Sequence, residues 1–425
     1  MNTSGLSLEQ APPISIPFRF FLTASVFSLL AGLSITYYGE DLLLSRWSPM
    51  ALGVTHLITL GFLAQVMSGA VVQLMPVLAG APLPAAVTTS TIVHLGLIAG
   101  TLLLVAGFIL SIDLSLLSGA IILIASFTLL LLSAGMAFLR SKAYLSKTLT
   151  LGLGWLALVP TLLLGLLLVL SLTGYIAPLQ LLPLVDLHAS WGLLGWVGIM
   201  LFAVMLQLLP MFYVTPEFPA YIRRWLLPLI FFLLLLLTFA RFMGSDLLQL
   251  GLLPVVLALV LSASTVLLAI RKRKRSIRDA NLYFLWTGMG SLWCAALVWI
   301  SAGDTMLVGI LILVGVCMSV PIGIIYKVIP FLCWFHLQSQ QIKQGDFSYR
   351  SPSMKEFIPE WAMRGHYALH LIAFGGLLIA VGYPTYFARL SGLLFTLSSI
   401  FFFINLLKAF TMYRKEQRQL SARLE

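Results

Sequence analysis

Long apolar stretches separated by short polar connections run along almost the whole chain. A helix that crosses a bilayer needs about 20 predominantly apolar residues. The only long connections are the basic run 271–279 and the polar segment 336–364. The pattern predicts an all-α polytopic membrane protein, with residues 1–425 forming a single transmembrane domain. The predicted spans are 15–38, 50–76, 87–110, 114–139, 149–172, 181–210, 223–243, 247–270, 280–301, 305–335, 365–383 and 386–412.

Composition agrees with this class of protein and excludes others. Hydrophobic residues make up 60% of the chain and charged residues only 9%, whereas soluble domains are about half apolar and about a quarter charged. A soluble globular protein, a disordered chain and a disulfide scaffold are therefore excluded.

The basic residues predict the orientation of the spans. When the connections are assigned alternately to two sides, one side and the chain ends together carry 20 of the 25 Lys and Arg residues. Because basic residues mark the cytoplasmic side, both termini are predicted to be cytoplasmic. The net charge of +11 is then explained by helix ends that meet anionic lipid headgroups. The expected partner is thus the lipid bilayer, and no nucleic acid is expected.

Three spans share a feature near their inner ends, which predicts an internal repeat. Each has a long polar residue three positions before a proline, and the three spans lie four helices apart. Proline also commonly ends helices, so a single match would mean little. The segments are VVQLMP (71–76), MLQLLP (205–210) and IYKVIP (325–330), with the polar residues Gln73, Gln207 and Lys327. Lys327 is expected to extend its ammonium group toward water. The predicted four-helix pseudo-repeats are 87–210, 223–335, and 365–412 together with 15–76.

Histidines are the main ionisable residues inside the predicted spans, where such residues are costly and are therefore candidates for function. No Asp or Glu lies in the middle of a span. Neutral imidazole is the commonest metal ligand and also an axial ligand of haem iron. His56 and His188 lie about six residues inside the outer ends of the second and sixth spans, roughly 10 Å deep. Their matched depth makes them the first choice as ligands of a haem or a metal ion.

Four further residues are secondary candidates for cofactor binding. His94 lies in the inner half of the third span, and His370 lies near the inner start of the eleventh, one turn from His366. Arg241 and Arg389 lie at outer helix ends, where they could pair with haem propionates or simply anchor the helices. A membrane histidine can also serve only as a hydrogen-bond partner between helices.

The second span carries a resemblance to a known family. It reads HLITLGFLAQVMSGAVVQLMPVLAG over residues 56–80, so His56, the small residue Gly69 and Pro76 follow one another toward the inner end. This order resembles helix II of the haem–copper oxidase superfamily, in particular its nitric-oxide-reductase-like members. Together with the opening PFRFFLTA (17–24), the segment is also similar to the NnrS family of haem- and copper-containing membrane proteins linked to nitric oxide.

The resemblance implies a haem b with His56 as an axial ligand, and it places His188 where the sixth-helix histidine of oxidases binds copper. It also implies the inner membrane of a bacterium, other respiratory membrane subunits as partners, and a role in respiratory or nitric-oxide metabolism. The chain departs from the family pattern, because residues 223–243 and 305–335 contain no histidine. The usual three-histidine copper site is therefore missing, and oxygen reduction by the usual route is not expected. The paired HxHE pattern of the NnrS family is reduced to Thr55–His56–Leu57.

These observations favour an integral membrane haem- or metal-binding protein on an oxidase-subunit-I-like scaffold, with haem b favoured over copper. Whether the protein is an enzyme stays open. A secondary transporter is the first alternative, since twelve spans also describe many carriers. A structural or assembly subunit without a cofactor is the second, because it would agree with the missing histidines.

Overall fold

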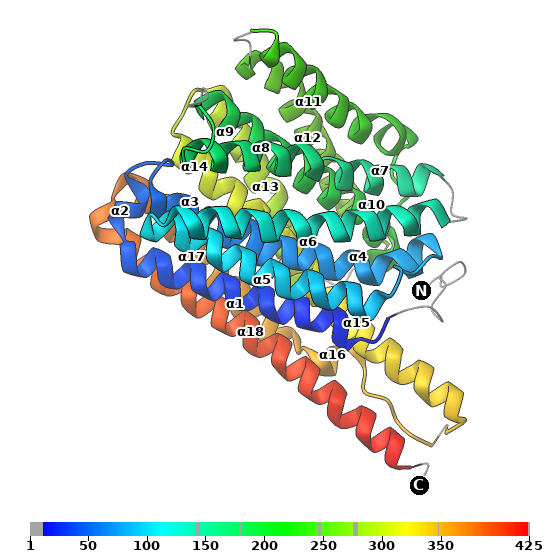
Figure 1. The fold of residues 1–425 in the computed structure, drawn as a ribbon. Helices are drawn as coiled ribbons and strands as arrows, with labels where there is room; N and C mark the ends of the chain where they lie inside the picture. Colours follow the sequence, from blue (N-terminus) through cyan, green and yellow to red (C-terminus); the bar gives the residue numbers. More distant parts are fainter. Residues whose placement is uncertain are drawn as a thin grey trace. The chain divides into compact units, whose positions relative to one another are not determined.

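The computed structural model describes residues 12–140, 145–177, 181–244, 248–274, 279–346 and 348–423. Every regular element within these ranges is helical (Figure 1). The α-helices are α1 (Ser15–Tyr38), α2 (Glu40–Leu43), α3 (Pro49–His56), α4 (Ala64–Ala79), α5 (Ala86–Leu110), α6 (Asp113–Arg140), α7 (Leu145–Leu156), α8 (Leu158–Leu172), α9 (Leu181–Ala189), α10 (Ile199–Tyr213), α11 (Leu227–Phe242), α12 (Leu248–Arg271), α13 (Ala280–Ile300), α14 (Thr305–Ile310), α15 (Ser319–Gln344), α16 (Met354–Phe357), α17 (Glu360–Gly382) and α18 (Pro384–Ala422). Wider π-helical segments are Leu57–Leu63, Ser190–Gly198, Ile222–Leu226 and Leu311–Val316.

Within the described ranges, 12 helices are long and apolar enough to cross a membrane, which confirms the predicted number of spans. The first nine agree with the predicted bounds to within a few residues. The last three are longer than predicted, because they run over Thr305–Gln344, Glu360–Gly382 and Pro384–Ala422. The polar segment 336–364 connects the tenth and eleventh spans as predicted, but parts of it are helical, because α15 continues to Gln344 and α17 begins at Glu360. Hydropathy detects the apolar part of a helix, whereas a nucleated helix continues into polar sequence at little further cost.

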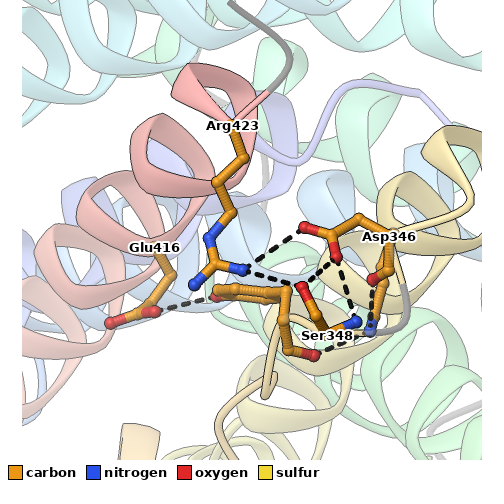
Figure 2. A network of polar contacts seen from close by, with 6 residues as sticks. Asp346, Ser348, Glu416 and Arg423 are labelled. Carbon is orange, nitrogen blue, oxygen red and sulfur yellow. Dashed lines mark hydrogen bonds and ion pairs between the residues drawn. The ribbon is translucent and has the colours of Figure 1, made fainter.

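Polar contacts join the end of α15 and the segment after it to the end of α18 (Figure 2). Arg423 forms an ion pair with Asp346 (Nη1–Oδ2 3.4 Å), and its guanidinium lies 5.4 Å from the centre of the Tyr349 ring. Tyr349 Oη donates a hydrogen bond to Glu416 Oε2 at 2.8 Å. The hydrogen bond from Ser348 and the nearby Arg423 lower the pKa of Asp346. Burial, followed by the bond to Glu416, raises the pKa of Tyr349.

The chain divides into two compact units. Unit 1 comprises residues 1–12, 71–277 and 289–312, and unit 2 comprises residues 13–70, 278–288 and 313–425.

Unit 2 is built on the close packing of α1 and α18, which run antiparallel and side by side in Figure 1. Gly32 lies against Thr396, and Gly392 lies against the backbone of Thr36. Ser28 Oγ and Ser399 Oγ are 2.6 Å apart between the same two helices. Small residues at these positions let the helix backbones approach, which drives association where no water is available to favour apolar contact.

Unit 1 uses the same device in the hairpin of α5 and α6. Gly107 lies against Leu116, and Gly119 lies against Leu104. The sixth and seventh spans are joined by a hydrogen bond from Trp191 Nε1 to Thr238 Oγ1 at 2.8 Å. The indole of Trp191 is fully buried, so this bond gives its N–H a hydrogen-bond acceptor in the protein interior, where water is not available.

The three spans with the shared proline motif also share a π-helical segment. Each π segment begins 19 or 20 residues before the proline, in the pairs Leu57 and Pro76, Ser190 and Pro210, and Leu311 and Pro330. All three prolines lie inside helices rather than at their ends, so helix termination does not explain the motif. The common spacing agrees with the repeat, which itself stays a prediction.

Candidate functional site

His56 lies where the second span changes from an α-helix to a π segment. Helix α3 ends at His56, and the π segment begins at Leu57. His56 Nδ1 lies 2.8 Å from the backbone oxygen of Leu52. A carbonyl oxygen only accepts hydrogen bonds, so Nδ1 carries the proton and the lone pair of the neutral ring is on Nε2. This is the tautomer of a metal ligand, because ligating histidines donate their other N–H to a carbonyl or a carboxylate.

His188 has the same arrangement in the sixth span. It lies two residues before the π segment that begins at Ser190. Its Nδ1 is 3.0 Å from the backbone oxygen of Thr161 in α8, and its ring lies against Gly165 of the same helix. Helix α8 therefore sets both the orientation and the tautomer of the ring, and the lone pair is again on Nε2.

Both side chains are half-buried, but they belong to different compact units. His56 is in unit 2 and His188 is in unit 1. That one haem or metal ion binds both residues stays a prediction.

The secondary candidates are distributed between the same units. Arg389 is in unit 2, where its side chain lies against Gly39. His94 is half-buried in α5 of unit 1, and Arg241 lies in the last turn of α11 in that unit. Each unit thus contains one first-choice histidine and one arginine suited to an anionic group, and their roles stay predictions.

A second group of polar side chains is buried inside unit 2. Asn405 Nδ2 donates to Tyr326 Oη at 2.9 Å, and Tyr326 Oη lies 2.7 Å from His366 Nδ1. His370 Nε2 lies 2.8 Å from Ser319 Oγ. All five side chains are at most 5% exposed. We call Ser319, Tyr326, His366, His370 and Asn405 the imidazole cluster.

Three helices and an aromatic shell hold the imidazole cluster. His366 and His370 lie one turn apart on α17 and so share a face. The His366 ring stacks on Phe402 of α18 with centroids 5.4 Å apart, and Phe284 of α13 lies 5.3 Å and 5.4 Å from the two histidine rings. The sequence identified the histidine pair by its four-residue spacing. It gave no signal for Ser319, Tyr326 and Asn405, which are ordinary polar residues in apolar helices.

Lys327 differs from the expectation that its ammonium group extends to water. Its Nζ lies 3.0 Å from Asp279 Oδ2, and the two side chains are only 15% and 11% exposed. Asp279 directly precedes α13 and belongs to the basic connection 271–279. Nothing in the local sequence pairs these residues, because they are 48 positions apart.

Within the described residues, no three or more His, Cys, Asp or Glu side chains form a group that could hold a metal ion. A haem makes a smaller demand on the protein, because the porphyrin supplies four ligands and one or two axial side chains complete the site.

The apolar helices define the class of this protein as a polytopic integral membrane protein. No protein-family model and no curated protein matches the sequence. The resemblance to haem-containing membrane proteins thus rests on the residues of the first two spans.

Proposed function

We propose that this membrane protein binds a haem b through His56, with His188 as the second ligand or as a residue on the distal side of the haem. The supporting observation is that each ring donates Nδ1–H to a backbone carbonyl and that each histidine lies one or two residues before the start of a π segment. Each ring thus has its lone pair on Nε2, the nitrogen that a metal centre requires. Short π segments inside α-helices are rare and frequently occur at functional sites.

Other features of the two units agree with a bound prosthetic group. Gln65 in the second span is fully buried, and neither of its amide atoms has a hydrogen-bond partner. Such a group needs a bound molecule or water to satisfy it. Arg389 in unit 2 and Arg241 in unit 1 are each candidates to pair with a haem propionate, and a bound haem would supply iron-centred electron transfer or binding of a diatomic gas. A role in respiratory or nitric-oxide metabolism follows from the family resemblance, and copper is the less favoured cofactor.

The absorption spectrum of the protein purified from haem-replete cells tests this proposal. We expect a Soret band that is lost in His56→Ala and is shifted or lost in His188→Ala. His336→Gln is the matched control, since it removes an imidazole that is not proposed as a ligand, and it should keep the band. A colourless wild-type protein without haem and without metal would refute the proposal.

A secondary transporter is a second candidate, and the buried Lys327–Asp279 pair favours it. Lys327 lies inside the tenth span and Asp279 directly precedes the ninth, and ionisable residues inside spans often mark the path of a transported ion or substrate. Substrate-dependent uptake into reconstituted vesicles that Asp279→Asn abolishes would support this function. A colourless protein that copurifies with a respiratory subunit would instead support a structural or assembly role.

A further inference from the structure

We infer that the exposed side of α18 beyond residue 407 is a docking surface for the headgroups of anionic phospholipids. We call its four basic side chains the basic face, and they are Lys408, Arg414, Lys415 and Arg418. Basic helix ends in general attract anionic lipid, and the fold of unit 2 gives one such end the form of a site. The inference is independent of the proposed haem, and every residue that carries it belongs to unit 2.

Helix α18 is much longer than a bilayer is thick. Its 39 residues extend about 58 Å, whereas the hydrocarbon core of a bilayer is about 30 Å thick. The neighbouring helix α17 has 23 residues and is about 34 Å long, so it just spans the core. The part of α18 that continues past the start of α17 must therefore lie outside the hydrocarbon.

A contact between these two helices gives the level at which α18 leaves the hydrocarbon. Asn405 Nδ2 lies 3.5 Å from the backbone oxygen of Ala362 in the first turn of α17. The adjacent Trp361 is 69% exposed and is therefore level with the turn of α18 that precedes Lys408. Because tryptophans are enriched at the membrane–water interface, this interface crosses α18 close to Lys408.

One side of α18 changes from apolar to basic at this level. With 3.6 residues per turn, the exposed apolar side chains before Lys408 and the basic face occupy the same sector of the helix, about 120° wide. The apolar members of this sector are Leu390, Leu393, Leu397, Ile400, Ile404 and Leu407. The four basic side chains are exposed as well. An apolar surface that continues directly into positive charge fits the acyl chains and the headgroup of one phospholipid.

The protein does not neutralise the basic face. Within the part of the chain that the structure describes, none of its four side chains forms an ion pair. Glu416 is the one acidic residue in the sequence of α18, and it lies on the opposite side, where it accepts a hydrogen bond from Tyr349 Oη at 2.8 Å (Figure 2). Phosphate oxygens are good partners for the exposed guanidinium and ammonium groups.

The direction of the side chains on α18 favours the bilayer as the location of this partner. Helical side chains tilt toward the N-terminus of their helix, which for this end of α18 is toward the hydrocarbon. The guanidinium of Arg414 accordingly lies 5.9 Å from the centre of the Phe410 ring, one turn nearer to Lys408. Arg414 and Lys415 follow Lys408 by about 9–10 Å along the axis, and the headgroup layer is about 5–7 Å thick. Their tilt brings the charges back toward this layer.

Contacts on the opposite side of α18 keep the basic face turned outward. Tyr413 and Leu420 are buried, and Gln340 Nε2 at the end of α15 donates to Ser421 Oγ at 3.1 Å. Because this side of the helix is occupied by protein, the basic face is held ready for a ligand from the membrane.

Photo-crosslinking in lipid nanodiscs tests the docking surface. Benzoylphenylalanine replaces Thr411, an exposed residue among the basic side chains, in the full chain with equimolar dioleoyl-phosphatidylglycerol and dioleoyl-phosphatidylcholine. Mass spectrometry then gives the ratio of the two lipid adducts. The same probe at Val87 is the reference, because it is exposed in the first turn of α5 and residues 47–139 contain no Lys or Arg. We expect the ratio at Thr411 to exceed that at Val87 about fivefold or more.

Variants and salt separate an electrostatic site from a general effect on the helix. Lys408→Gln/Arg414→Gln/Lys415→Gln/Arg418→Gln should bring the ratio at Thr411 to the value at Val87. The matched variant Lys408→Arg/Arg414→Lys/Lys415→Arg/Arg418→Lys keeps all four charges and should keep the enrichment. In the wild type, 1 M NaCl shortens the Debye length to about 3 Å and should lower the enrichment about threefold or more.

Three results would overturn the inference. The first is a wild-type ratio at Thr411 equal to that at Val87, or no lipid adduct at Thr411, which would leave the basic face to a partner in water such as an acidic protein. The second is enrichment that persists after all four charges are removed. The third is enrichment in the wild type that 1 M NaCl does not change.

Discussion

Removing one charge of the Lys327–Asp279 pair should strongly destabilise the protein. The ammonium and carboxylate groups are 3.0 Å apart and only 15% and 11% exposed. At an effective dielectric constant of about 20, two unit charges at this distance attract by about 5.5 kcal/mol. Desolvation offsets much of this attraction while the pair is intact. When one partner is removed, the other loses its counter-charge at 3.0 Å in a mostly buried position, at a cost of about 3–5 kcal/mol.

We therefore expect Asp279→Ala and Lys327→Met each to lower the free energy of unfolding by about 3–5 kcal/mol. The double variant Asp279→Ala/Lys327→Met should recover most of this loss, because it leaves no unpaired charge. The free energy of unfolding of all three variants is measured in mixed micelles by raising the concentration of a denaturing detergent while circular dichroism monitors the helix content. The difference between the double variant and the two single variants gives the coupling energy directly.

Arg364→Gln is the matched control. It breaks the ion pair with Glu360, in which the arginine side chain is 59% exposed, and it should leave unfolding unchanged within error. The reasoning would be refuted if Asp279→Ala behaved like Arg364→Gln. It would also be refuted if the double variant were as unstable as the sum of the single variants, since the two charges would then not interact.

Two further predictions concern helix packing and pH. Gly392→Ala should lower the free energy of unfolding by about 1–3 kcal/mol, because the added methyl group would overlap the backbone of Ile35 and Thr36. Gly375→Ala on α17 is the control, since open space surrounds that position, and equal effects in the two variants would contradict the proposed packing of α1 and α18. The Asp346 carboxylate has a lowered pKa in the folded protein, so its contribution to the network of Figure 2 is present above its unfolded value of 3.8 and is lost as the pH falls through the lowered value. Limited proteolysis by pepsin should therefore cut residues 345–353 only at strongly acidic pH. Arg423→Gln should move this cleavage to higher pH, because it removes a group that lowers the pKa of Asp346. A cleavage profile that Arg423→Gln leaves unchanged would argue against the network.

The sequence by itself determined the class of the protein and the number of candidate spans, and it predicts the depth of the candidate ligands. Each of these depends only on the order of apolar and polar residues along the chain, because the thickness of a bilayer fixes how many apolar residues a span requires. The depth of His56 and His188 follows from their distance to the ends of these spans. The bounds of the last three spans could not be read in the same way, because their helices continue into polar sequence.

Only the tertiary structure decided which groups the polar residues meet. Lys327 and Asp279 are far apart in the sequence, as are Tyr326 and Asn405, and no local pattern joins either pair. The tautomers of His56 and His188 likewise depend on which backbone oxygen lies beside each ring. In an interior without water, a polar group must find its partner on another turn or another helix. Hydropathy therefore shows that a polar residue is buried, but the packing of the helices determines its chemistry.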